Sequence, residues 1–325
     1  EALDEGTVHA FDPTERHTIR NLGGGDRLRA VRGGQAAARA CAARRPSGPG
    51  KDRCPPPDQL HLRPLNERLL ARVRRSWPLV RVLTVREFRA RYRQSALELA
   101  WGLITPVVTL AVYGVVLTRL FHVDGNGAPY LSMVWIGMVV WTMFSTAVVV
   151  GVQSLVANAD LVSKVYFPRE VLPLSIVGAS LVDLVIGLVV LVPLLAVQVG
   201  RVGLCAVAAL PVLVVVLVWA AAITVFTATV SVFLRDAMHA TRLAIQVGFF
   251  ASPIMYSTAI LPPNLYAWSR INPLAVCIDA LRAALLFHRW PEWRWLAVHA
   301  VAGVVALIGA VLVTRAVEDR MVDVI

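Results

Sequence analysis

Among the residues of this chain that could do chemistry, one carboxylate is unusual because of its surroundings. Asp183 lies inside an otherwise uncharged run, residues 172–199, that is long enough to cross a bilayer. A carboxylate at that depth is costly, and it indicates either a functional role such as a proton relay or a buried partner. A single carboxylate is a weak basis for a proton relay, so structural pairing, or a position beside a water-filled cavity, is the preferred interpretation.

The sequence has no motif for nucleotide hydrolysis or for metal-dependent chemistry. It contains no G-x-x-x-x-G-K-[ST], no G-x-S-x-G, no H-E-x-x-H and no EF-hand loop. The 4 cysteines show no C-x-x-C spacing, and the 7 histidines are scattered. We therefore assign no catalytic residue and no metal site, and we expect the chain to bind no cofactor and to be no enzyme.

A second candidate site is a short charged segment between two apolar runs, LVSKVYFPREVLP at residues 161–173. Asn158 suits the N-cap of a helix, and Pro168 should end that helix at the preceding residue. The expected helix offers charged and aromatic side chains of the kinds found at protein interfaces. They are Asp160, Lys164, Tyr166, Phe167, Pro168 and Arg169. An ordinary connecting loop and a docking site for another protein both remain open on these grounds.

The elements that must position these residues follow from composition. Of the 325 residues 57% are hydrophobic and only 16% are charged, whereas soluble domains carry about 25% charged residues. The shortfall comes from residues 99–325, where apolar runs recur that can each cross a bilayer. The predicted fold class is an all-α polytopic membrane protein with six transmembrane helices. We place the spans at about 99–121, 130–152, 172–199, 203–233, 243–260 and 294–314.

The basic residues set the expected orientation. Nine arginines lie between residues 68 and 93, before the first span, and none lies in the first loop, 122–129. The positive-inside rule then places the N-terminus, the C-terminus and the segment 161–173 in the cytoplasm. It also accounts for the net charge of +11 without nucleic acid as a partner. Residues 261–294 conflict with the rule, since they should be external yet carry four arginines.

The first part of the chain differs from the rest. Residues 1–75 are a basic Gly/Ala/Arg/Pro-rich extension, which we expect to be disordered because it cannot bury enough apolar surface. Residues 78–98 are expected to form a helix with Arg86, Arg89 and Arg93 on one face. Such a basic helix suits the anionic cytoplasmic leaflet, and contact with a partner protein is the alternative.

Several motifs, in order from about residue 78 to the end, carry a resemblance to a known family. They are RYRQS (91–95), Trp101 with Pro106, PYLSMVWIGMVVWTMFS (129–145), NADLVSKVYFPREVLPL (158–174), FLRDA (233–237), SPIMYS (252–257), LPPNLYAWSRINPLAVCIDALRAALL (261–286) and the final VEDRMVDVI. In this series the chain resembles the permeases of ABC-2 type transporters, specifically the branch that exports lipid-linked polysaccharides: O-antigen, capsule and wall teichoic acid. Glu98, where the family usually has a small residue, and the long N-terminal extension depart from the pattern.

The resemblance implies that residues 76–325 form an ABC-2 type transmembrane domain. It would pair with a second copy of itself and with two separate ABC ATPase subunits, which would bind ATP and Mg. The cargo would be an undecaprenyl-linked polysaccharide or a teichoic-acid-like polymer. The expected location is the bacterial cytoplasmic (inner) membrane, in contact with membrane lipids.

By the same resemblance, three segments have expected roles. Residues 79–97 correspond to an interface helix near the ATPase, with Arg86, Arg89, Tyr92 and Arg93. Residues 158–169 correspond to a coupling helix that docks into the ATPase. Residues 253–290 correspond to an external gate region of short helices that dip toward the membrane, which would explain the arginines there.

Aromatic residues in the apolar runs have two interpretations. Sugar rings stack on aromatic faces, which suits a polysaccharide channel, but Trp and Tyr also anchor proteins at membrane interfaces. The preferred candidates for channel lining are Trp141, Phe144 and Tyr256. Two other functions stay open: an ABC-2 exporter of a drug or small lipid, and an ion-coupled secondary transporter that uses Asp183.

Overall fold

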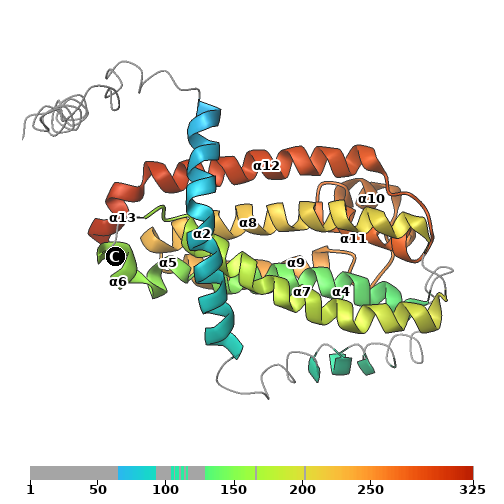
Figure 1. The fold of residues 1–325 in the computed structure, drawn as a ribbon. Helices are drawn as coiled ribbons and strands as arrows, with labels where there is room; N and C mark the ends of the chain where they lie inside the picture. Colours follow the sequence, from blue (N-terminus) through green and yellow to red (C-terminus); the bar gives the residue numbers. More distant parts are fainter. Residues whose placement is uncertain are drawn as a thin grey trace, which may run out of the picture. The chain divides into compact units, whose positions relative to one another are not determined.

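The computed structural model describes residues 65–92, isolated residues between 104 and 115, and residues 129–164, 167–200 and 203–324, with side chains from Trp77 to Arg91 in the first range. Every regular element in these ranges is a helix, which confirms the all-α fold class (Figure 1). Labelled as in Figure 1, the helices are α2 (Leu65–Tyr92), α4 (Tyr130–Gly151), α5 (Ser154–Ala157), α6 (Ala159–Lys164), α7 (Val171–Gln198), η3 (Leu204–Ala208), α8 (Ala209–Phe233), α9 (Ala237–Ala251), η4 (Thr258–Ile260), α10 (Pro263–Ser269), α11 (Pro273–Leu285), α12 (Trp293–Ala316) and α13 (Glu318–Val324).

Four of the described helices are long and apolar enough to cross a membrane. They are α4, α7, η3 together with α8, and α12, with 22, 28, 30 and 24 residues. Even 22 residues extend about 33 Å, which exceeds a hydrocarbon core of about 30 Å. Their bounds lie close to the predicted spans 130–152, 172–199, 203–233 and 294–314. The predicted span 99–121 lies outside the described residues apart from isolated helical positions, so the total of six spans and the cytoplasmic termini stay predictions.

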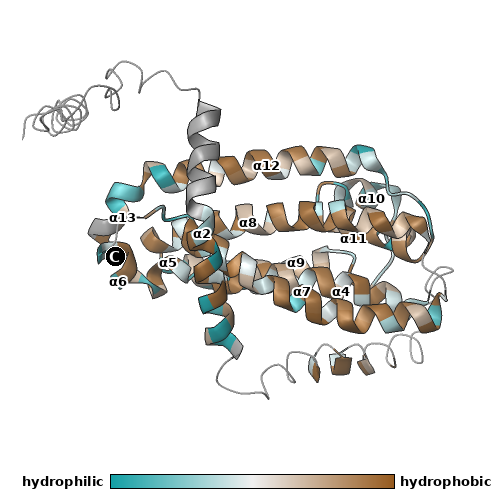
Figure 2. Ribbon diagram, in the orientation of Figure 1, coloured by the Kyte–Doolittle hydropathy of each residue, from teal (hydrophilic) through white to brown (hydrophobic). Residues whose placement is uncertain are grey.

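The central helix of the described bundle is α4. Within the chain, 72% of its apolar stretch is buried, against 22% for α7 and α12 and 33% for α8. α7, α8, α9 and α11 all pack against it. Hydrophobic residues run along the outer helices as well (Figure 2), and on α7 Val189 and Val192 are 63% and 65% exposed. Such outward apolar faces suit contact with lipid chains.

α4 and α7 approach each other closely at a glycine. The indole Nε1 of Trp135 donates to the carbonyl of Gly187 at 3.0 Å. A Cβ atom at Gly187 would lie 2.7 Å from Cγ2 of Val139. Glycine is therefore required at this crossing because a side chain would collide with α4.

The predicted start of the first helix is wrong. α2 begins at Leu65 and continues through Pro78, so residues 65–75 are helical rather than part of a disordered extension. Proline removes one backbone donor, and this helix tolerates it in its interior. α2 ends at Tyr92, and residues 93–97 of the predicted interface helix lie outside the described residues. α2 contacts α7 where Thr84 Oγ1 donates to the carbonyl of Ser175 at 3.3 Å.

The predicted fifth span, 243–260, is also wrong as a single crossing helix. α9 has 15 residues and ends at Ala251, so it extends only about 22 Å. Ser252 has an extended backbone (φ −99°, ψ 143°), because a residue that precedes proline, here Pro253, is disfavoured in the helical region. Residues 252–257 then form an irregular connection to the short helices that follow.

Two hydrophobic clusters hold the described helices together. The larger is centred on α4 and includes residues of α7, α8, α11 and α12. The smaller cluster consists of Leu83, Leu155, Val162, Phe167, Val171, Leu172, Ala228, Val232 and Met321. Figure 1 shows α5, α6 and α13 at one end of the bundle and α10 and α11 at the other. The two groups of short helices therefore occupy opposite ends of the spanning helices.

Candidate functional site

The segment between α4 and α7, which we call the α5–α6 segment (residues 152–170), is built around Asn158. The Asn158 carbonyl accepts from the amides of Leu161 and Val162, each at 3.0 Å, at the expected start of the helix. Its side-chain amide donates to the carbonyl of Ser154 at 2.8 Å and so closes the preceding turn. Asn158 thus joins α5 to α6 rather than capping α6 with its side-chain oxygen.

The tip of the α5–α6 segment is exposed and charged. The side chains of Asp160 and Lys164 are 92% and 73% exposed and form an ion pair of 2.9 Å. Ser163 between them is also exposed, whereas Val162 on the opposite face is fully buried in the smaller cluster. The segment therefore presents a polar surface on an apolar base.

Phe167 and Arg169, two of the residues predicted to contact the ATPase, are buried in the chain. They are only 7% and 4% exposed, and Phe167 belongs to the smaller cluster. The Arg169 guanidinium lies 5.4 Å from the centre of the Phe167 ring and donates to the carbonyl of Val162. Pro168 is half-buried, and Tyr166 lies outside the described residues. Phe167 and Arg169 therefore hold the base of the segment. Among the predicted contact residues whose side chains are described, only Asp160 and Lys164 lie at its tip.

Two ion pairs connect this base to the C-terminal part of the chain. Glu170 Oε1 accepts from Nε and a terminal nitrogen of Arg315 at 3.1 and 2.8 Å. Arg169 Nε lies 3.7 Å from Glu318 Oε1. The side chains of Arg169 and Glu170 are 5% and 9% exposed, so both pairs are largely shielded from water.

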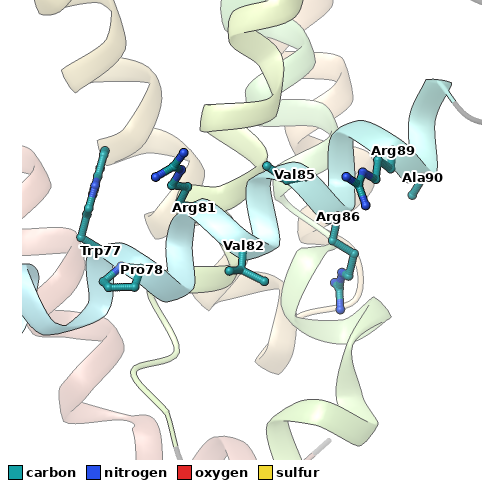
Figure 3. A pocket seen from close by; sticks show the side chains of 8 residues that line it. All are labelled: Trp77, Pro78, Arg81, Val82, Val85, Arg86, Arg89 and Ala90. Atoms are coloured by element: carbon teal, nitrogen blue, oxygen red, sulfur yellow. The ribbon is translucent and has the colours of Figure 1, made fainter.

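α2 lies beside the same segment. Arg86 donates to Asn158 Oδ1 at 2.8 Å and pairs with Glu87 at 2.7 Å. Arg89 is exposed, whereas the Tyr92 side chain and Arg93 lie outside the described residues. Figure 3 shows apolar and basic side chains along this helix. Of the four predicted interface residues, Arg86 is the one that the structure places against the α5–α6 segment.

Asp183 has an ionic partner on α2. Its carboxylate lies 3.3 Å from a guanidinium nitrogen of Arg91, and the two side chains are 16% and 21% exposed. The preferred interpretation of Asp183 as one half of a structural pair therefore agrees with the geometry. The pair joins α7 to α2.

The aromatic candidates do not line one surface. Trp141 edges an open groove between α4 and α9, which it shares with Phe249 and Phe250. Its ring centre lies 5.7 Å from that of Phe249 and 5.8 Å from that of Phe144. Phe144 is 5% exposed and packs behind the groove in the larger cluster. Tyr256 lies in the irregular connection after α9 and is not part of the groove.

Polar side chains of the groove were not singled out by the sequence pattern. Ser145, Thr146 and Gln246 lie among its aromatic and aliphatic lining residues. Helical spacing could have found them, since Trp141 and Ser145 are four residues apart on α4 and Gln246 and Phe250 are four apart on α9. The groove combines aromatic faces with hydrogen-bonding groups.

At the other end of the bundle, Arg282 of α11 holds the irregular connection in place. Its guanidinium donates to the carbonyls of Met133, Ile254 and Tyr256 at 3.1, 2.8 and 3.0 Å. Burial lowers its pKa to about 10, which Asp279 opposes, so Arg282 stays charged at neutral pH. Burial also raises the pKa of Asp279, although hydrogen bonding and nearby arginines act against it.

The remaining arginines of residues 261–294 divide into two kinds. Arg270 pairs with Glu292 at 2.9 Å and stacks on the ring of Tyr266 at 4.7 Å from its centre. Arg289 and Arg294 are exposed. Arg270 and Arg282 thus have structural roles, which accounts for half of the positive charge that conflicts with the positive-inside rule.

In the described residues, four spanning helices, of which α4 is the enclosed one, and short helices at both ends define a multi-pass membrane protein. A sequence profile described as ABC-2 type transporter matches residues 78–286, and the chain belongs to this family. The resemblance inferred from the motifs is therefore confirmed. The chain is a transport subunit of the bacterial cytoplasmic membrane, as predicted.

Curated relatives carry one name. The chain is 29% identical over 231 residues to the O-antigen export system permease protein RfbA of Myxococcus xanthus. The aligned region covers 70% of this chain and 88% of that protein. The chain is 22% identical over 248 residues to the O-antigen export system permease protein RfbA of Klebsiella pneumoniae. Here the aligned region covers 76% of this chain and 95% of that protein. The similarity extends over most of each relative.

Proposed function

We propose that the chain is the permease subunit of an ATP-driven exporter that moves a lipid-linked polysaccharide across the cytoplasmic membrane. The observation that carries this proposal is the similarity to O-antigen export permeases over 88% and 95% of their lengths. In this proposal ATP hydrolysis belongs to two ABC ATPase subunits, which would bind ATP and Mg²⁺. The chain itself would hold no cofactor.

The α5–α6 segment is the proposed docking site for the ATPase. Its exposed tip offers Asp160, Ser163 and Lys164, while fully buried Val162 fixes its base. Arg86 of α2 is bonded to Asn158 within the same segment, so α2 would also sense its displacement. A small polar tip on an apolar base can pass a push from the ATPase to α4 and α7, which are the helices that it joins.

α9 supports the proposed pairing of two copies. It is shorter than a membrane crossing, and among its residues only Thr241 is buried in the chain. Leu243, Val247 and Phe250 follow one another at helical spacing and are 61%, 60% and 75% exposed. A second copy of the chain is the proposed cover for this face, because a helix that cannot reach across the bilayer gains little from lipid alone.

The groove between α4 and α9 is the proposed contact for the glycan. Trp141, Phe249 and Phe250 offer ring faces, and Ser145 and Gln246 offer hydrogen-bonding groups to sugar hydroxyls. Since the same α9 carries the proposed dimer face, the route would lie between the two copies. Tyr256 and Phe144, the other predicted lining residues, do not open onto this groove and would support it from behind or from one end.

The test reconstitutes the permease and its cognate ABC ATPase in liposomes with undecaprenyl-linked glycan. We expect glycan transfer that needs ATP and the ATPase. Lys164→Glu should weaken ATPase binding by about tenfold or more, as for a central interface residue. Arg294→Glu, an exposed substitution on a segment predicted to be external, is the matched control and should leave binding unchanged. Transfer without the ATPase, or transfer of small lipids and drugs but no glycan, would overturn the proposal.

A further inference from the structure

The C-terminal part of the chain is folded onto the base of the α5–α6 segment. Met321 of α13 is fully buried and belongs to the smaller cluster together with Val162 and Phe167. Val317, which precedes α13, packs against the same cluster. The end of the chain is therefore part of the core on which the segment rests.

The same contact is made by charged groups. Arg315, in the last turn of α12, donates twice to Glu170, the residue that precedes α7. Arg169 faces Glu318, in the first turn of α13. Each pair joins the loop between α6 and α7 to the end of α12 or to the start of α13. Opposite charges that are shielded from water resist separation more than exposed pairs do.

We propose that residues 315–321, which we call the C-terminal brace, make α12 move together with the α5–α6 segment. Arg315 and Glu318 are then positioning residues for energy coupling, since they act through Glu170 and Arg169 and not on the ATPase or the glycan. The inference rests on the proposed function, because it assumes that an ATPase pushes this segment. By this inference the push would move α12 as well as α4 and α7, the two helices that the segment joins directly.

The burial of Arg169 and Glu170 supports this arrangement over a passive C-terminal tail. A push on the tip at Lys164 would reach Arg169 through Val162, whose carbonyl accepts from the Arg169 guanidinium. From Arg169 and Glu170 the displacement would pass to Glu318 and Arg315 across the two ion pairs. Thr314, one residue before Arg315, also shares a hydrogen bond of 2.7 Å with Thr229 of α8, so α12 is coupled to α8 in turn.

The experiment measures ATP hydrolysis and glycan transfer in the same proteoliposomes of permease and ATPase. Arg315→Gln combined with Glu170→Gln removes one pair without leaving a single buried charge. Arg320→Gln alters an exposed arginine of α13 and is the matched control. We expect ATPase binding and hydrolysis to be kept, whereas glycan transferred per ATP falls about fivefold or more, the lower end of ordinary coupling between sites. Arg315→Lys, which keeps a charge for Glu170, should restore part of that ratio.

The outcomes separate the two levels of inference. If the wild-type complex transfers no glycan with ATP, the proposed function fails. If the wild-type complex works and the double variant keeps the wild-type ratio of glycan to ATP, the brace is only structural and the inference fails, even when less complex is recovered. Should the double variant not fold, Glu318→Gln is measured in the same way, because its partner lies at 3.7 Å and its loss is milder; an unchanged ratio there also overturns the inference.

Discussion

Replacing Arg282 by Met should destabilise the protein more than most single substitutions. The guanidinium is 3% exposed and donates to the carbonyls of Met133, Ile254 and Tyr256. Methionine has a similar length but no donor, and a buried acceptor left without a partner costs about 1–3 kcal/mol. Asp279, 3.9 Å away, also loses its nearest cation. Removal of the buried charge offsets part of this cost, and we expect the free energy of unfolding to fall by about 3–5 kcal/mol.

The assay is thermal unfolding of the purified permease in detergent or nanodiscs. A loss of that size corresponds to a Tm lower by roughly 6–20 °C, at about 2–4 °C per kcal/mol. Arg282→Lys should fall between the wild type and Arg282→Met, because one ammonium group cannot reproduce the planar fork that reaches three carbonyls. Arg294→Met, at an exposed position, should stay within about 2 °C. An Arg282→Met variant as stable as this control would refute the reasoning.

Two further perturbations test the helix contacts. Asp183→Asn should cost about 1 kcal/mol and keep ATP-dependent transport, because the carboxylate pairs with Arg91; a folded variant without transport would instead favour ion coupling through Asp183. Gly187→Ala places a Cβ atom 2.7 Å from Val139 and should lower stability by about 1–3 kcal/mol, measured by the same thermal unfolding. Gly309→Ala, with nothing within 4 Å of its Cβ, is the control, and equal stability of the two variants would contradict the close crossing of α4 and α7.

The spanning helices were predictable because length and hydropathy are local properties of the sequence. α4, α7, α8 and α12 each follow from an apolar run bounded by polar residues or proline. The two errors in helix bounds come from proline. Pro78 looks like a helix start but lies within α2, whereas Pro253 breaks an apolar run that otherwise resembles a span. The local sequence does not distinguish a tolerated proline from a helix-breaking one, since neighbouring groups decide which occurs.

The site was predictable in position but not in orientation. The order of residues around Asn158 and Pro168 indicates a short helix and its end, and α6 lies there. The burial of Phe167 and Arg169 depends on Met321 and Glu318, which are distant in sequence and pair with them only in the folded chain. The same holds for Arg282, whose three acceptors come from α4 and from the connection after α9. The count of basic residues marked Arg282 as an exception to the positive-inside rule but did not indicate its role.

The enclosure of α4 determines how the surrounding bilayer acts on the protein. α7, with 28 residues, extends about 42 Å and must tilt in a membrane of ordinary thickness. A thicker or thinner membrane changes that tilt first, because α7 and α12 expose their apolar faces while α4 does not. The change then reaches α4 through its contact with Gly187. Lipid composition can therefore alter transport at a distance, without any lipid entering the interior of the bundle.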